Sequence, residues 1–131
     1  MSQLDLADGL RLLHEASDGE YLGHEAHLRF AWSVLDEADD VEDAARLTCL
    51  TIRHAAELGG TPTKYHATVT IFWIRLLEHL RVTYPDVSSV AEMLEQYPAL
   101  ADSSLPQSHW SDLDNDDARA HWVEPDLIPI P

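Results

Sequence analysis

Cysteine and long apolar stretches are both scarce in this sequence of 131 residues. Cys49 is the single cysteine, so no disulfide can form within the chain, as is typical of proteins in a reducing compartment. We therefore expect a cytoplasmic location. A transmembrane helix needs about 18 consecutive apolar residues, and because no such run occurs we expect no membrane-spanning segment. The start of the chain also lacks the basic and apolar regions of a secretion signal.

Positive charge is equally scarce. Eight Lys and Arg residues face 24 Asp and Glu residues, which gives a formal net charge of −16 at pH 7. Phosphate backbones and anionic lipid surfaces repel such a chain, so we expect neither nucleic acid nor membrane partners. The acids gather in residues 36–43 and 112–118, a pattern typical of a solvated surface and also suited to docking on a basic partner protein.

Several common enzyme signatures are missing from the chain. No serine sits in a nucleophile elbow, and no glycine-rich loop is placed to cradle a nucleotide. No two-residue hairpin turn separates alternating apolar runs, which argues against a β-sheet. These absences exclude the usual serine hydrolases and nucleotide-binding folds, and they favour a helical protein.

The spacing of apolar residues predicts an all-α fold: a compact antiparallel helical bundle with short extra helices, in a single domain over residues 1–131. Four main helices are predicted over residues 3–16, 22–37, 41–58 and 63–83, and two short ones over residues 88–97 and near residues 112–121. Ala44, Leu47, Leu50 and Leu58 mark the apolar stripe of the third helix, which Asp39-Asp40 should cap and Gly59-Gly60 should end. Ser89 and Glu92 have the spacing of a capping box at the start of the helix over residues 88–97. The fourth helix is apolar almost all round, which predicts a central position. The ending EPDLIPIP predicts an extended, proline-rich C-terminal strap that lies against the bundle.

Four histidines fall on or beside the inward stripes of three consecutive helices. His24 and His27 lie near the start of the second helix, His54 near the end of the third, and His66 near the start of the fourth. Short loops make neighbouring helices antiparallel. The start of the second helix, the end of the third and the start of the fourth should therefore meet at one end of the bundle. We therefore expect the four imidazoles to open on one pocket, with Glu57 beside His54.

One interpretation of this cluster is a metal site. Imidazoles and a carboxylate suit iron, zinc, nickel or manganese. The candidate metal ligands are His24, His27, His54, Glu57 and His66. The spacing is not specific, because HEAH differs from the HExxH motif of zinc proteases and the paired Glu-x-x-His motifs of di-iron bundles are absent. The sequence leaves open whether the pocket holds one divalent ion or none.

The metal-free interpretation uses the same groups as acid and base, since imidazole titrates near neutral pH. Such a pocket suits an elimination or a ring closure. The candidate catalytic residues are His24, His27, His66 and Tyr65.

The same pocket should attract an anion. Two predicted helix starts, with their unpaired N–H groups, point toward it, and Lys64 is the only lysine of the chain. A carboxylate, a sulfate or a phosphate ester is the expected substrate type. The candidate substrate-binding residues are Arg29, Lys64, Thr68, Thr70 and Trp73.

Three motifs, HEAHLRFAW, KYHATVT followed by Trp73, and DARAHWVEPDLIPIP, resemble a family of small bacterial proteins without an assigned activity. The family pattern is F-x-H-x-x-H-L-R-x-A-W, then K-Y-H-E-T-x-T-x-x-W, then A-R-x-x-F-V-x-P-D. The resemblance implies a small helical fold. It places His24, His27, Arg29, Lys64, Tyr65, His66, Thr68 and Thr70 at motif positions. Ala67 stands where the family pattern has glutamate, which suggests a specialised or a non-catalytic member.

Two functions follow as hypotheses. The first is a small enzyme that acts on an anionic metabolite through the histidine pocket, with or without a bound divalent metal. The second is a non-catalytic accessory subunit that docks on and supports a biosynthetic partner enzyme. The convergent histidines favour the enzyme, whereas Ala67 and the acidic surface favour the subunit. A homodimer and a complex with a partner enzyme both remain open.

Overall fold

The computed structural model describes residues 4–17 and 23–131, and across these residues it contains helices and no strands. The predicted all-α class is therefore confirmed. The α-helices are α1 (Leu6–Ser17), α2 (His24–Glu37), α3 (Val41–Leu58), α4 (Ala67–Thr83), α5 (Val90–Gln96) and α6 (Asp116–Ala120). Three short 3-10 helices are η1 (Pro62–Lys64), η2 (Pro98–Ala101) and η3 (Leu105–Ser108). Within the described ranges no helix is both long enough and apolar enough to cross a membrane.

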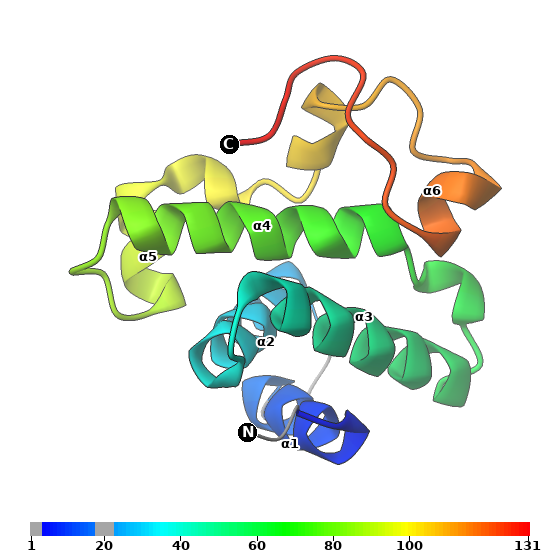
Figure 1. Cartoon of the computed structure of the whole chain (residues 1–131), viewed down its shortest axis with the longest axis horizontal. Helices are drawn as coiled ribbons and strands as arrows, with labels where there is room; N and C mark the ends of the chain where they lie inside the picture. The colour runs from blue at the N-terminus through cyan, green and yellow to red at the C-terminus, as the bar shows by residue number, and fades with distance from the viewer. Residues whose placement is uncertain (1–3, 18–22) are drawn as a thin grey trace.

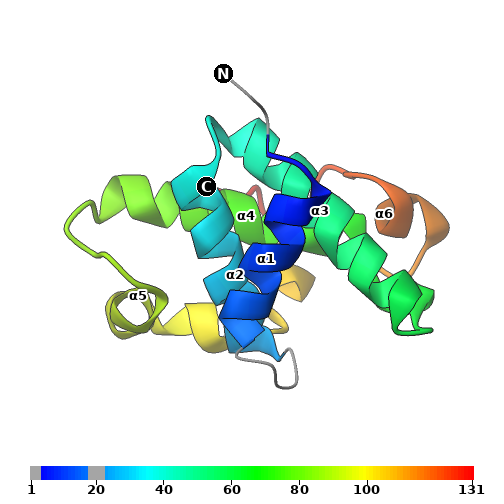
Figure 2. The ribbon, with the colours of Figure 1, turned by 90° about the horizontal axis from the view of Figure 1, so that it is seen from below.

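Helix α4 lies at the centre, as its apolar sequence predicts. Its side chains Phe72, Ile74 and Leu77 are completely buried. Figure 1 shows α2 and α3 on one side of α4 and the C-terminal segment with α6 on the other. In that view α4 runs across the picture while α2 is seen nearly end-on, so these two helices cross. Helix α1 packs on the outside of α2 and α3 (Figure 2).

Local signals at the helix ends match the sequence analysis. Asp40 caps α3 by accepting a hydrogen bond from the Asp43 N–H at 2.8 Å, and Ser89 caps α5 by accepting one from Glu92 at 3.2 Å. Just beyond α3, Gly60 adopts a φ of 73°, a left-handed conformation that glycine tolerates best.

The start of the fourth helix differs from the prediction. Residues 63–83 do not form one continuous helix, because η1 ends at Lys64 and α4 begins only at Ala67. His66 has an extended backbone, with φ −143° and ψ 109°, and it forms the N-cap of α4. Its ring therefore caps the helix start and is not part of the first helical turn.

The predicted inward stripe of α3 is correct for Ala44 and Leu47, which are buried, and wrong for Leu50 and Leu58. Leu50 is 41% exposed and Leu58 is 74% exposed, whereas Leu47, Thr48 and Thr51 are buried. The helix is thus rotated relative to the expected orientation, so that a face of smaller and more polar residues points inward.

A close approach of α1 explains this rotation. Gly9 of α1 is buried against α3, and a β-carbon built on Gly9 would lie 2.0 Å from the Thr51 hydroxyl oxygen and 3.2 Å from a methyl carbon of Leu47. Only a residue without a side chain allows this separation. The short side chains of α3 must therefore face α1.

The C-terminal strap, residues 124–131, lies against the segment that follows η3, and its Ile130 packs against the core. The Leu127 N–H donates to the His109 carbonyl oxygen at 2.9 Å, and the Trp110 indole N–H donates to the carbonyl oxygen of Val123 at 2.9 Å. The Arg75 guanidinium of α4 stacks on the ring of Trp122, 4.3 Å from its centroid.

The α1–α3 contact can be tested with Gly9→Ala. Alanine favours a helix over glycine, by about 1 kcal/mol, so a loosely packed site would be stabilised. We expect the opposite, a loss of about 1–3 kcal/mol in the free energy of unfolding, because the new methyl group collides with Thr51. Urea denaturation measures the change. The double variant Gly9→Ala with Thr51→Ala should recover much of the loss, and unchanged stability of the single variant would contradict the contact.

Candidate functional site

A cavity of about 400 Å³ opens between α2, α3 and α4, within the size range of small-ligand sites. Its polar lining consists of His24, His27, Thr48, Lys64, His66, Thr70 and Ser103. The rest of its wall is formed by Gly23, Leu28, Phe30, Ala31, Ile52, Val69 and Trp73. Three of the four predicted histidines therefore share one cavity, and among the described residues no carboxylate lines it.

His24 is fixed by two contacts. Its Nε2 lies 2.9 Å from the carbonyl oxygen of Leu100, and its ring meets Trp73 edge to face with 4.7 Å between the centroids. A carbonyl oxygen only accepts hydrogen bonds, so Nε2 carries the proton. When the ring is neutral, its Nδ1 therefore keeps a lone pair.

His27 is the group best suited to act as a base. Its Nδ1 donates to the carbonyl oxygen of Gly23 at 2.9 Å, which leaves the Nε2 lone pair without a protein partner in the described chain. The pKa of His27 is lowered, chiefly because the surrounding protein removes part of the hydration of the ring and to a smaller extent because His24 lies nearby. The hydrogen bond to Gly23 opposes this shift. The ring is exposed to solvent on one side, so protons can reach it.

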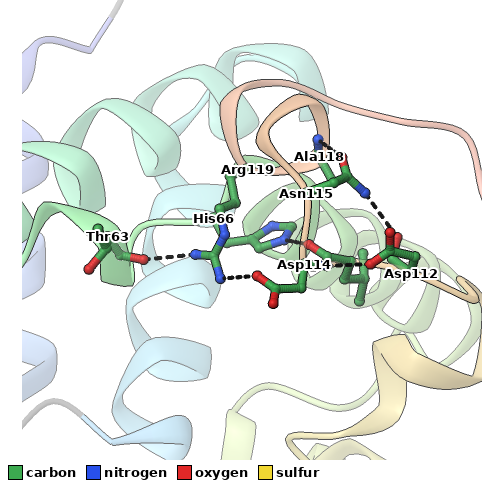
Figure 3. Close-up of polar contacts among 8 residues, drawn as sticks. Thr63, His66, Asp112, Asp114, Asn115, Ala118 and Arg119 are labelled. Atoms are coloured by element: carbon green, nitrogen blue, oxygen red, sulfur yellow. Dashed lines mark hydrogen bonds and ion pairs between the residues drawn. The ribbon is translucent and has the colours of Figure 1, made fainter.

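His66 has a structural role, because both of its ring nitrogens are engaged. Nδ1 accepts the Val69 N–H at 3.2 Å, and Nε2 donates to the Leu113 carbonyl oxygen at 2.7 Å. Figure 3 shows the hydrogen bond from His66 Nε2. It also shows the one from Arg119, which donates to the carbonyl oxygen of Thr63 at 2.8 Å. His66 thus joins the start of α4 to the C-terminal segment, and its lone pair is not free for substrate.

Lys64 is the unpaired cation of the site. Six arginines, namely Arg11, Arg29, Arg46, Arg53, Arg81 and Arg119, form ion pairs with carboxylates. Arg75 stacks on Trp122. For the exposed Lys64 amine, the described part of the chain provides no hydrogen-bond or ion-pair partner. A protein of net charge −16 therefore presents one uncommitted positive charge at a cavity whose described lining residues include no acid.

Thr48 contributes a buried hydroxyl that is not hydrogen-bonded. The residue is only 4% exposed, and among the described residues its Oγ1 has no hydrogen-bond partner. The other threonine of the wall differs, because the Thr70 hydroxyl donates to the His66 carbonyl oxygen at 2.7 Å. Thr48 thus contributes to the cavity wall with atoms other than its hydroxyl oxygen, which is enclosed by protein.

Three predicted site residues lie elsewhere. The Arg29 guanidinium donates twice to the Ala16 carbonyl oxygen, at 3.0 and 3.2 Å, and so binds the end of α1. The Tyr65 hydroxyl donates to the sulfur of Cys49, and burial together with this bond raises the pKa of Tyr65. The Thr68 hydroxyl donates to the His121 carbonyl oxygen at 2.8 Å. Arg29, Tyr65 and Thr68 do not line the cavity, so their predicted catalytic or substrate-binding roles are not supported.

The five-residue metal set is also not assembled. His54 and Glu57 are absent from the cavity wall, and Glu57 accepts a hydrogen bond from Arg53 at 3.1 Å. The rotation of α3 is the reason, since it turns the stripe with His54 away from the cavity. Residues 4–17 and 23–131 contain no group of three or more His, Cys, Asp or Glu side chains placed to hold a metal ion.

Sequence analysis missed Thr48 and Ser103. Thr48 and Thr51 are three residues apart on α3, and polar residues on a face shared with Ala44 and Leu47 were the available signal for a buried polar position. No local pattern identifies Ser103, which reaches the wall from the loop after η2. Comparisons of the chain with protein-family models, with curated proteins and with solved structures found no match. The family resemblance therefore stays a prediction.

The lowered pKa of His27 predicts a pH effect on stability. The unfolded chain takes up the proton first as the pH falls below about 6.5, so the His27 contribution to stability is complete above that pH and is lost on acidification through the lower pKa of the folded state. An NMR titration should show the His27 ring signals moving with a midpoint below 6.5. His27→Gln should reduce the acid destabilisation, whereas His79→Gln on the outer face of α4 should not. A midpoint at or above 6.5 would contradict the prediction.

Proposed function

We propose that the protein is a metal-free acid–base enzyme that acts on a small anionic metabolite held in this cavity. The observation that carries the proposal is the presence of Lys64 and His27 in one cavity wall, to which the described residues contribute no carboxylate, in a chain of net charge −16. The cation would hold the anionic group of the substrate, and the neutral imidazole would remove a proton beside it.

The proposal that the ligand is an anion rests on the charges at the cavity and not on the charge of the whole surface. The acidic surface repels anions, so binding needs a local source of positive potential. Lys64 supplies a full charge. The first turn of α2 adds a partial charge, because Gly23 has no side chain with which to cap the N–H groups there. A carboxylate, a sulfate or a phosphate ester fits this environment.

The case for base catalysis rests on His27. An imidazole with a free Nε2 and a lowered pKa is neutral at physiological pH and accepts a proton without prior deprotonation. Eliminations and ring closures both begin with removal of a proton, from carbon or from a heteroatom. A single base near an anion anchor is sufficient for that step.

The case for metal chemistry is weaker on geometric grounds. A mononuclear site with catalytic function normally has three protein ligands. In the part of the chain that the structure describes, only His24 and His27 combine a place in the cavity wall with a ring nitrogen free of protein hydrogen bonds, because His66 uses both of its nitrogens. Two imidazoles three residues apart do not complete such a site.

Anion binding is tested with benzoate and phenyl phosphate, and with benzyl alcohol as the neutral comparison. We expect the anions to bind and the alcohol to bind more weakly, because Lys64 supplies a full positive charge at the cavity. Lys64→Met keeps the length of the side chain and should weaken anion binding by about tenfold, as expected for loss of one charge-assisted contact. Isothermal titration calorimetry provides the affinities.

The matched control is Arg53→Met, which removes an exposed cation of α3 that pairs with Glu57 outside the cavity. It should leave the affinities unchanged. Failure of all anions to bind, or equal losses in the two variants, would overturn the proposed function.

The base is tested with 5-nitrobenzisoxazole, an aromatic probe from which a base removes the proton on carbon while the N–O bond breaks and a coloured phenolate forms. We expect a measurable rate that rises with pH through the lowered pKa of His27, competitive inhibition by benzoate, and no effect of a chelator. His27→Gln should lower the rate by at least about tenfold, since general base catalysis is typically a 100-fold effect or more. His79→Gln is the control, and an unchanged rate in His27→Gln would refute the role of His27 as the base.

A further inference from the structure

The hydrogen bonds within the cavity wall narrow the class of substrate. We infer that the anionic substrate has an apolar body, a hydrocarbon ring or a branched aliphatic group, and is neither a sugar acid nor a sugar phosphate. This inference rests on the proposed function, because it takes the acid group of the substrate to bind at Lys64. It adds the chemistry of the rest of the substrate.

The hydrogen-bond donors of the less exposed side chains in the wall are already committed to the protein. Nε2 of His66 donates to a backbone carbonyl oxygen, and so do Nε2 of His24 and the hydroxyl of Thr70. The hydroxyl oxygen of Thr48 is enclosed by protein atoms. While the imidazoles are neutral, a substrate hydroxyl buried against these side chains therefore receives no hydrogen bond from them.

Within the described wall, the side-chain donors left for a ligand belong to two exposed residues: the Lys64 amine and the Ser103 hydroxyl. In the proposed function Lys64 binds the acid group, so only the Ser103 hydroxyl is left for the rest of the substrate. A sugar acid or a sugar phosphate carries several hydroxyls that lose water on binding. Each hydroxyl that is buried without a new partner weakens the complex.

Apolar side chains supply the surface that a substrate body can cover. Ile52 of α3, together with Val69 and Trp73 of α4, lines the cavity, and all three are only half-buried. The Trp73 indole is held in place by its edge-to-face contact with the His24 ring, with 4.7 Å between the centroids. Covering such surface with hydrocarbon favours binding through the hydrophobic effect. The cavity of about 400 Å³ has room for one ring and its acid group.

The experiment compares acids of equal size that carry either methyl or hydroxyl groups: 3,5-dimethylbenzoate with 3,5-dihydroxybenzoate, and 4-methylbenzoate with 4-hydroxybenzoate. Because the carboxylate is common to each pair, the ratio of the two affinities does not depend on the strength of the Lys64 contact. We expect the dimethyl acid to bind at least about tenfold more tightly than the dihydroxy acid, and the monomethyl acid at least about threefold more tightly than its partner. Burial of each methyl group favours binding, whereas each hydroxyl loses hydration. Calorimetry measures each affinity.

Val69→Thr is the decisive variant, because threonine has nearly the same shape and replaces a methyl group of the wall with a hydroxyl. It should reduce the preference for the dimethyl acid by about threefold or more, and Ile52→Thr should do the same from α3. Val82→Thr is the matched control, since Val82 lies on the same helix as Val69, is 70% exposed and does not line the cavity. It should leave both affinities unchanged.

The outcomes separate the two proposals. If the acids bind through Lys64 but the members of each pair bind equally, or the hydroxylated acids bind more tightly, the inference of an apolar body is wrong and the proposed function stands. The same holds if both Val69→Thr and Ile52→Thr retain the full preference, or if Val82→Thr reduces it equally. If none of the acids binds, the proposed function fails and the inference fails with it.

Discussion

The contact between Gly9 of α1 and Thr51 of α3 determines which residues reach the candidate site. Because no side chain intervenes at Gly9, α1 approaches so closely that α3 must present its short residues there. Thr48 lies one turn before Thr51 and therefore also turns inward, toward the cavity. The same rotation leaves Leu50 and Leu58 outside and removes His54 from the cavity wall. One close helix crossing thus decides the chemistry of one wall.

The opposite wall depends on His66, which performs a task usually given to Ser, Thr, Asp or Asn. By accepting a hydrogen bond from Val69 and donating one to Leu113, it fixes the start of α4 and ties the C-terminal segment to it. Lys64 precedes this cap by two residues, and Thr70 follows it by one turn. The imidazole therefore positions the cavity wall without taking part in the proposed proton transfer.

The charge distribution explains why a small cationic region matters here. Six arginines are neutralised by neighbouring carboxylates and one is stacked on tryptophan, so the surface offers anions little attraction. In residues 4–17 and 23–131, the side chains of the cavity wall include a lysine and three histidines but no acid. In the proposed function this contrast confines anion binding to the cavity. The neutral state of His27 keeps its lone pair available at physiological pH.

The sequence by itself was sufficient to predict the features that depend only on neighbouring residues. Capping by Asp40 and Ser89, the glycine stop after α3 and the apolar character of α4 each depend on a few neighbouring residues, and all are confirmed. His24, His27 and His66 share a cavity as predicted. The antiparallel arrangement used for that prediction does not explain it, because α2 and α4 cross and His54 lies outside the cavity wall.

Tertiary structure alone decided the rest. α3 carries two faces that could be buried, one rich in leucine and one of small residues. The periodicity of apolar residues does not show which face is buried, because Gly9 of α1, far away in the sequence, sets how closely α1 and α3 approach. Arg29 contacts Ala16, Tyr65 contacts Cys49, and Thr68 contacts His121. The spacing of residues along the chain does not predict these contacts. Hydrogen-bond partners and helix rotation depend on packing between segments far apart in sequence, so the composition of the site was fixed only when the helices came together.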